Sequence, residues 1–189
     1  MQTTKNYQKY TSKNPLKKLL INNFLDRVEA VVIPLKPKSI LDAGCGEGFA
    51  LERLKEKKIG KTLLGIDSSN RALKTGRLIH PDIFFKKGDI YQLDFADNNF
   101  DLVICLEVLE HLPYPKKALD EILRVSKRYC LISVPHEPFF GIVSSSGRSE
   151  HLNHWSVKSI TSFLGEKMKI LNILKPFPWL LILGEKPIR

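Results

Sequence analysis

Short apolar runs alternate with helical patterns along most of the chain. The runs predict strands near 39–43, 62–66, 82–86, 100–106, 128–134, 168–174 and 178–185. Apolar residues at three- and four-residue steps predict helices near 48–57, 69–78, 107–111, 115–126 and 156–165. Continuously apolar strands that alternate with helices are typical of a parallel sheet covered on both faces. The pattern therefore predicts an α/β fold with one sheet of seven strands.

The last two apolar runs are joined only by "KPFP", residues 175–178. This connection is too short for the helical crossover that neighbouring parallel strands require. We therefore expect the two runs to pair antiparallel. The predicted sheet is doubly wound, mostly parallel, and ends in a C-terminal antiparallel hairpin.

A separate helical pattern precedes the first strand. Asn14 and Pro15 suit the cap and the first position of a helix, and apolar residues then follow at helical steps up to Pro34. We divide the chain into a basic arm with an N-terminal helix, residues 1–38, and a binding domain, residues 39–189.

Positive charge is concentrated at the start of the chain, whose formal net charge is +10. Residues 1–20 contain no acid and hold Lys5, Lys9, Lys13, Lys17 and Lys18. Such an arm could contact RNA, an anionic lipid surface or an acidic substrate, or it could be a solvated leader.

The remaining composition suits a cytoplasmic protein. The N-terminus has no apolar stretch of signal-peptide type, and no apolar run has the length of about 20 residues that a membrane-spanning helix needs. We expect no integral membrane segment. Cys45, Cys105 and Cys130 lie within or beside apolar runs, which predicts buried thiols in a reducing compartment. No feature indicates an oligomeric state.

The stretch "SILDAGCGEGFALERL", residues 39–54, passes from the first strand into a turn with three alternate glycines. Without a Cβ, glycine lets a ligand approach the main chain. Dinucleotide-binding sheets carry the pattern G-x-G-x-x-G, which faces a pyrophosphate. Here Asp42 precedes Gly44, and its charge would repel a pyrophosphate and attract an ammonium group. The turn therefore favours a ligand with a cationic amino-acid end.

Acids also follow the next two strands. Asp67 ends the second strand, in the position from which a carboxylate accepts both hydroxyls of a ribose. Asp89 and Ile90 follow the third strand, where a carboxylate beside a backbone N–H can bind the amino edge of an adenine. Together with the glycine turn, these positions favour a ligand that combines an amino acid, a ribose and an adenine.

The segments "LDAGCGEG", "GIDSS", "KGDIYQLDF" and "FDLVICLEVLEHL" together resemble the class I S-adenosylmethionine-dependent methyltransferases, in their small-molecule, type 11-like branch. The resemblance covers roughly residues 39–185 and implies a Rossmann-like fold with S-adenosylmethionine as cofactor. The cofactor-binding positions that it implies are Asp42, Ala43, Gly44, Gly46, Asp67, Ser68, Asp89, Ile90 and Leu106.

The segment "LEVLEH" after the fourth strand has three alternative roles. His111, or His136 after the fifth strand, could be a catalytic general base toward a hydroxyl acceptor. Alternatively, Glu107, Glu110, His111 and a loop histidine such as His154 could bind a divalent metal. This pattern resembles the metal set of ubiquinone-pathway O-methyltransferases and small-RNA 2′-O-methyltransferases. In the third alternative the side chains only line the cofactor pocket.

The methyl acceptor is predicted to be an oxygen of a small molecule. The chain lacks the Asn/Asp-Pro-Pro-aromatic signature of methyltransferases that act on planar nitrogens, and "LEHLPYPKKALDEILRVSK" resembles the branch that acts on quinone, lipid and sugar hydroxyls. RNA 2′-O methylation, with a nucleic-acid partner, and a catalytically inactive cofactor-binding subunit are the alternatives. The aperiodic segment 135–154 is predicted to be a lid over the methyl site.

Overall fold

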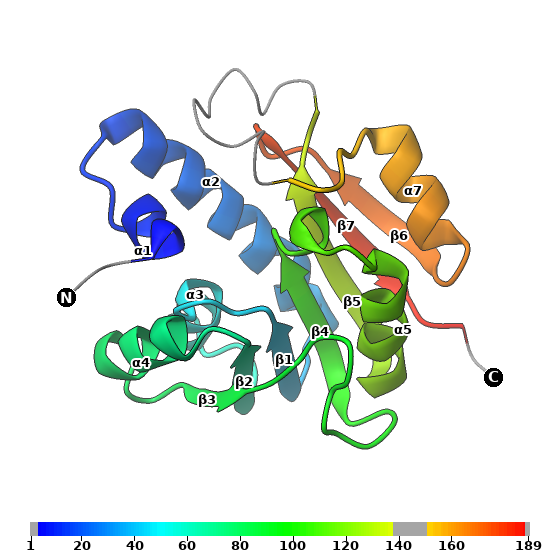
Figure 1. Cartoon of the computed structure of the whole chain (residues 1–189), viewed down its shortest axis with the longest axis horizontal. Coiled ribbons are helices and arrows are strands. Elements are labelled where there is room, and N and C mark those ends of the chain that lie inside the picture. Colours follow the sequence, from blue (N-terminus) through cyan, green and yellow to red (C-terminus); the bar gives the residue numbers. More distant parts are fainter. Residues whose placement is uncertain (1–3, 138–150, 188–189) are drawn as a thin grey trace.

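The computed structural model describes residues 4–137 and 151–187, which form a single seven-stranded sheet with helices on both faces (Figure 1). The strands are β1 (Ser39–Ala43), β2 (Thr62–Asp67), β3 (Phe84–Lys87), β4 (Phe100–Leu106), β5 (Ser126–Pro135), β6 (Lys169–Leu174) and β7 (Trp179–Glu185). Their order in the sheet is β3-β2-β1-β4-β5-β7-β6. Each strand lies within two residues of the bounds that the apolar runs predict.

The strand pairing confirms the predicted parallel sheet with an antiparallel hairpin at its C-terminal end. Strands β1 to β5 pair parallel, whereas β7 is antiparallel to both β5 and β6. The return strand β7 lies between β5 and β6, and its residues from Trp179 to Gly184 are buried. No residue of β6 is fully buried, in keeping with its place at the edge of the sheet. The α/β, Rossmann-like fold with a C-terminal antiparallel hairpin is thus confirmed.

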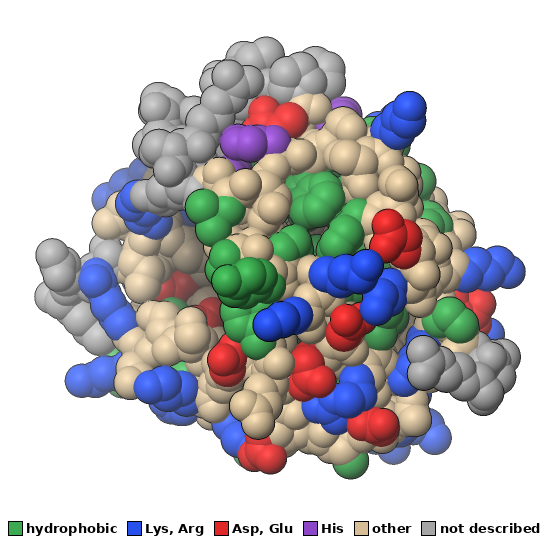
Figure 2. All heavy atoms as spheres, turned by 45° about the vertical axis from the view of Figure 1, so that its right-hand side comes forward, with side chains coloured by type: hydrophobic (Ala, Val, Ile, Leu, Met, Phe, Trp, Pro, Cys, Tyr) green, Lys and Arg blue, Asp and Glu red, His purple; other side chains and the backbone are tan. Residues whose placement is uncertain are grey.

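Two helical layers cover the sheet (Figure 1). The helices are α1 (Lys5–Tyr10), α2 (Pro15–Val32), α3 (Phe49–Glu56), α4 (Asn70–Ile79), α5 (Pro115–Val125) and α7 (Val157–Gly165), with 3-10 turns η1 (Ile33–Leu35) and η2 (Leu109–His111). Apolar residues of α2 and α3 pack on one face of the sheet, and those of α5 and α7 on the other. On the side that carries α5 and α7, acidic and basic side chains are interspersed (Figure 2).

Residues 107–111 do not form the predicted helix. Glu107 has a positive φ of 57°, and only the 3-10 turn η2 follows it. The backbone N–H of Glu107 donates to the carbonyl oxygen of Ser133 at 3.1 Å, so β5 determines how the chain leaves β4. The helical spacing of "LEVLEH" was therefore overridden by a contact from a neighbouring strand.

The basic arm is ordered over residues 4–10, so the solvated-leader alternative is wrong for this part. The Thr4 side chain accepts a hydrogen bond from the N–H of Tyr7 at 3.0 Å and caps α1. The following helix α2 shares a core with the sheet: Phe24 is 1% exposed and its ring centroid lies 5.0 Å from that of Trp179. The division of the chain at residue 38 stays a prediction.

Three further expectations concern single features. All three cysteines are buried and free, as expected. Among residues 4–137 and 151–187, no helix has both the length and the apolar character needed to cross a membrane. Most of the predicted lid, residues 138–150, lies outside the described residues.

The N-cap of α2 provides a stability test. The Asn14 side chain accepts a hydrogen bond from the N–H of Lys17 at 3.1 Å, so Asn14→Ala is expected to lower the free energy of unfolding by about 1 kcal/mol. Thermal unfolding should show a decrease of roughly 2–4 °C. The matched control is Asn22→Ala, at an exposed position inside the same helix, which should not destabilise because alanine favours helix. Equal melting temperatures for the Asn14 variant and the native protein would contradict the cap.

Candidate active site

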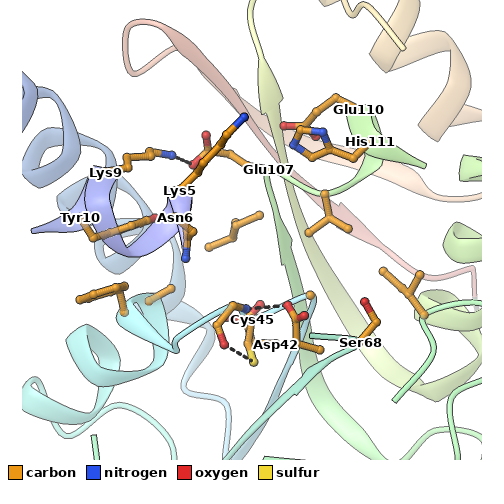
Figure 3. Close-up of a pocket in the computed structure, with 18 of the residues that line it drawn as sticks. Lys5, Asn6, Lys9, Tyr10, Asp42, Cys45, Ser68, Glu107, Glu110 and His111 are labelled. Carbon is orange, nitrogen blue, oxygen red and sulfur yellow. Dashed lines mark hydrogen bonds and ion pairs between the residues drawn. The ribbon is translucent and has the colours of Figure 1, made fainter. Parts of the chain in front are cut away.

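A pocket of about 1310 Å³ lies at the carboxyl ends of β1, β2 and β4, where α1 covers it (Figure 3). The carboxyl ends of parallel strands meet at one edge of the sheet, so residues far apart in sequence gather there. The sequence-predicted residues that line the pocket are Asp42, Gly44, Gly46, Asp67, Ser68, Asp89, Ile90, Leu106, Glu107, Glu110 and His111. Ala43 is fully buried in β1, and neither His136 nor His154 is among the lining residues.

The glycine turn is held against the end of β2. Gly44 and Gly46 have φ angles of 88° and 55°, in the left-handed region that favours glycine. The N–H groups of Gly44 and Cys45 both donate to the carbonyl oxygen of Ile66 at 2.9 Å. A Cβ at Gly44 would lie 2.5 Å from Cγ2 of Val108. The turn therefore needs glycine both for its backbone conformation and for the close approach of Val108.

Asp42 is an unusual buried acid. It is 2% exposed, and its Oδ1 has no hydrogen-bond partner among the described residues. Burial, and to a lesser degree the charge of Asp67, raises the pKa of Asp42 to about 8. A buried carboxyl without a partner is costly unless a ligand satisfies it. An ammonium group in the pocket would supply the missing donor and charge, so Asp42 fits the amino-acid end of S-adenosylmethionine.

Two further carboxylates are oriented by backbone N–H groups. Asp67 accepts hydrogen bonds from Gly46 N–H through Oδ2 and from Ser69 N–H through Oδ1, each at 2.8 Å. Asp89 accepts from Tyr91 N–H at 2.9 Å. A carboxylate oxygen can accept more than one hydrogen bond, so Asp67 and Asp89 retain capacity for ribose and adenine donors.

Helix α1 contributes residues that the sequence analysis did not assign to the site. Asn6 donates to Oε2 of Glu47 at 2.6 Å, and the hydroxyl of Thr4 donates to Oε1 of the same carboxylate. Glu47 lies within the glycine turn and is completely buried. The ring of Tyr10 stacks on Phe49 of α3, with centroids 4.6 Å apart. These contacts attach α1 to the glycine turn.

Glu107 joins α1 to β7. Lys9 forms an ion pair with its Oε1, and the indole N–H of Trp179 donates to its Oε2 at 2.7 Å. The only sequence signals for this arrangement were Thr4 as a helix cap and two tyrosines three residues apart, Tyr7 and Tyr10. These local signals predict a short helix, but they do not indicate which residues the helix contacts.

A cluster of one acid and two histidines lies beside Glu107. Ligand atoms of Glu110, His111 and His151 all lie within 4.8 Å of one another. Glu110 is 1% exposed, neither of its carboxylate oxygens has a partner among the described residues, and burial raises its pKa well above the usual value. The cluster includes His151 in place of the predicted Glu107 and His154. The Nδ1 of His154 lies 3.6 Å from Oε1 of Glu137.

The two histidines predicted as bases are placed differently. His111 lines the pocket, and its ring centroid lies 5.0 Å from that of His151. His136 donates its backbone N–H to the carbonyl oxygen of Pro178 at 2.9 Å. Burial lowers the pKa of the His136 side chain, as does the charge of Lys175. Of the two, only His111 is in the wall of the pocket.

Comparisons with known proteins find relatives for the central part of the chain. Residues 41–132 match the family described as "Methyltransferase domain". A demethylmenaquinone methyltransferase of Renibacterium salmoninarum is 41% identical over 88 residues, which cover 47% of this chain and 36% of that protein. A ubiquinone biosynthesis O-methyltransferase of Thiobacillus denitrificans is 39% identical over 101 residues, which cover 50% of this chain and 42% of that protein. The matches therefore span less than half the length of these relatives.

The fold has solved counterparts. The crystal structure of magnesium protoporphyrin IX methyltransferase from Synechocystis PCC 6803 with bound SAH superposes with a TM-score of 0.76, covering 96% of this chain and 92% of that chain at 18% identity. The resemblance noted in the sequence is thus confirmed: residues 41–132 form a methyltransferase domain of the class I S-adenosylmethionine-dependent kind.

Proposed function

We propose that this protein binds S-adenosylmethionine in the pocket beneath α1 and transfers its methyl group to an oxygen of a small molecule. The observation that carries the proposal is the buried, unpartnered Oδ1 of Asp42 beside a glycine turn, in the same pocket as His111. The name of the ubiquinone biosynthesis O-methyltransferase supports transfer to oxygen, and the names of both relatives support a quinone-type acceptor.

Each cofactor contact has a residue suited to it. Asp42 would accept from the ammonium group, Asp67 from the ribose hydroxyls and Asp89 from the adenine amino group, while Leu106 lies at the end of β4 beside them. S-adenosylmethionine supplies a sulfonium-bound methyl group when it is bound. Because methyl transfer is an in-line displacement, the main contribution of these residues is to hold the donor in a fixed orientation.

His111 is proposed as the group that accepts a proton from the acceptor hydroxyl. Its ring lies in the pocket wall next to His151 and to the buried Glu110. Histidine suits general base catalysis near neutral pH. Binding of a divalent metal by Glu110, His111 and His151 is the alternative use of this cluster, and a titration of the protein with Mg²⁺ or Zn²⁺ distinguishes the two.

The acceptor class is tested by measuring formation of S-adenosylhomocysteine with three additions: a demethylated quinol, an RNA pool and no acceptor. We expect turnover with the quinol, and His111→Gln should reduce it at least tenfold while S-adenosylhomocysteine binding is retained. Turnover with RNA alone would favour the 2′-O-methyltransferase alternative, and binding without turnover would favour an inactive subunit. A cytoplasmic location stays a prediction.

Asp67→Ala is expected to weaken S-adenosylhomocysteine binding by about 1–3 kcal/mol, because ribose hydroxyls would lose their acceptor. The change also removes the acceptor for Gly46 N–H and Ser69 N–H, so folding must be checked by circular dichroism. The measurement is calorimetric titration, with Asp94→Ala as the control because the Asp94 side chain is 90% exposed and outside the pocket. Unchanged affinity in a folded Asp67 variant would contradict the proposal that Asp67 binds the ribose hydroxyls.

A further inference from the structure

The first turns of α2 present leucines to solvent. Leu16 is 62% exposed and Leu19 is 65% exposed, whereas the buried face of the same helix begins at Ile21 and Phe24. Leu20, one turn before Phe24, packs against the core, whereas Leu16 and Leu19 lie at its exposed margin. Leu16 and Leu19 are therefore apolar side chains that the core of this domain does not use.

Positive charge flanks this stripe. Lys13, Lys17 and Lys18 are exposed, and none forms an ion pair with a residue that the structure describes. The first acid in the chain is Asp26, so residues 1–25 carry only positive side-chain charge. The start of α2 therefore combines exposed leucines with lysines, and residues 1–25 contain no acid that could neutralise the lysines.

The same end of α2 borders the pocket. Lys17 and Leu20 line it, together with Trp179, the first residue of β7, and the preceding Pro178. Phe177, which precedes these two residues, is 44% exposed. Figure 1 shows the start of α2 in the upper part of the molecule, at the edge to which the carboxyl end of β5 also points. The exposed leucines, the lysines and the rim of the pocket thus share one edge of the protein.

We propose that the start of α2 docks on an anionic lipid bilayer, with Leu16 and Leu19 inserted at the interface and Lys13, Lys17 and Lys18 against the lipid headgroups. Leucines beside lysines on one helix end are the combination that binds such surfaces. Two leucine side chains offer far less area than the roughly 1,000 Å² that a specific protein interface buries, so a bilayer fits this surface better than a folded partner. Docking brings the pocket rim to the membrane, where apolar acceptors of the proposed class dissolve.

The test is flotation of the full-length protein with vesicles, without cofactor or acceptor, so that its outcome is independent of methyl transfer. Vesicles of pure phosphatidylcholine are compared with vesicles in which about one lipid in three is phosphatidylglycerol. We expect binding to the anionic vesicles that weakens as salt is added, because the lysine contribution is screened. Equal binding to both kinds of vesicle, or binding to neither, would overturn the proposal.

Leu16→Ser combined with Leu19→Ser should weaken binding to anionic vesicles at least tenfold. The control is Leu78→Ser, because Leu78 is also 65% exposed but lies on α4, outside the pocket rim. The control variant should bind as the native protein does. Equal loss in the control and the double variant would contradict docking through α2.

The charge contribution is tested by replacing Lys13, Lys17 and Lys18 with glutamine, which should weaken binding about fivefold for each lysine removed. Replacement of Lys61, Lys74 and Lys158, exposed on other elements, removes the same charge and should cause a smaller loss. Sedimentation of the native protein measures whether it forms a dimer, and so tests whether a second copy of the chain, rather than a bilayer, covers Leu16 and Leu19. A dimer that the leucine changes dissociate, with no binding to vesicles, would overturn the proposal.

Discussion

Asp42→Asn is expected to bind S-adenosylhomocysteine ten- to a hundredfold more weakly than the native protein at pH 8. The buried Oδ1 of Asp42 has no partner within the described residues, so an ammonium group of the ligand supplies its first donor. Hydrogen bonds to charged groups contribute about 1.5–3 kcal/mol, and asparagine retains the shape of the side chain but not its charge. Calorimetric titration of both proteins measures the difference.

The affinity of the native protein should also depend on pH. The pKa of Asp42 is raised to about 8, so the unliganded carboxyl is mostly protonated below that pH. Binding to an ammonium group favours the ionised form, and affinity should therefore rise by up to about tenfold per pH unit from pH 6 to pH 8. The Asp42→Asn variant should lack this slope, and a slope of equal size in the variant would assign the pH dependence to another group.

The same substitution should stabilise the unliganded protein. Between the usual carboxyl pKa and about 8, the folded state holds a proton that the unfolded state has released, so stability falls as pH rises through this window. Asp42→Asn removes this loss and should raise the free energy of unfolding at pH 8 by about 1–3 kcal/mol. Asp120→Asn, an exposed acid on α5, should change stability by less than about 0.5 kcal/mol. A lower free energy of unfolding for the Asp42 variant would contradict the claim that the buried, unpartnered carboxyl destabilises the unliganded protein.

Gly44→Val is expected to weaken S-adenosylhomocysteine binding more than a hundredfold. Its φ of 88° disfavours any residue with a Cβ, and that Cβ would lie 2.5 Å from Cγ2 of Val108 in the pocket wall. The turn or Val108 must move, and either shift displaces the backbone that we propose to contact the cofactor. Calorimetric titration measures the loss of binding, and circular dichroism establishes that the variant is folded.

Gly60→Val is the matched control for backbone strain. Gly60 also has a positive φ, 81°, and its Cβ would meet Leu63 at 2.9 Å, but it does not line the pocket. The two variants should therefore lose similar stability, whereas only Gly44→Val should lose binding. A folded Gly44 variant with native affinity would show that the turn does not contact the cofactor.

The features that the sequence predicted well are those that local patterns encode. Apolar runs located the strands because burial on both faces leaves a continuous signal, and the short link at 175–178 required an antiparallel pair. Asp42 was expected near a ligand because a carboxylate before a glycine turn disfavours a pyrophosphate and attracts a cation; the structure places it in the pocket wall, and its contact with a cofactor stays a prediction. The placement of Asp67 and Asp89 followed from the parallel order of β1, β2 and β3.

The features that it missed depend on contacts between distant segments. Lys9 and Trp179 both bind Glu107. Lys9 lies 98 residues before Glu107 and Trp179 lies 72 residues after it, so no local sequence pattern encodes these contacts. The spacing of Glu107 and Glu110 suggested one helical face, but the hydrogen bond from Glu107 N–H to Ser133 on β5 produced a left-handed residue and a 3-10 turn instead. His151 joins Glu110 by the same kind of long-range contact.

Calorimetric titration of the native protein with S-adenosylhomocysteine, and separately with NAD, tests the cofactor assignment most directly. The pocket at the ends of β1, β2 and β4, with a carboxylate where a pyrophosphate would have to lie, predicts one site per chain that binds S-adenosylhomocysteine and binds NAD far more weakly. Tighter binding of NAD, or no binding of S-adenosylhomocysteine by the folded protein, would contradict the assignment.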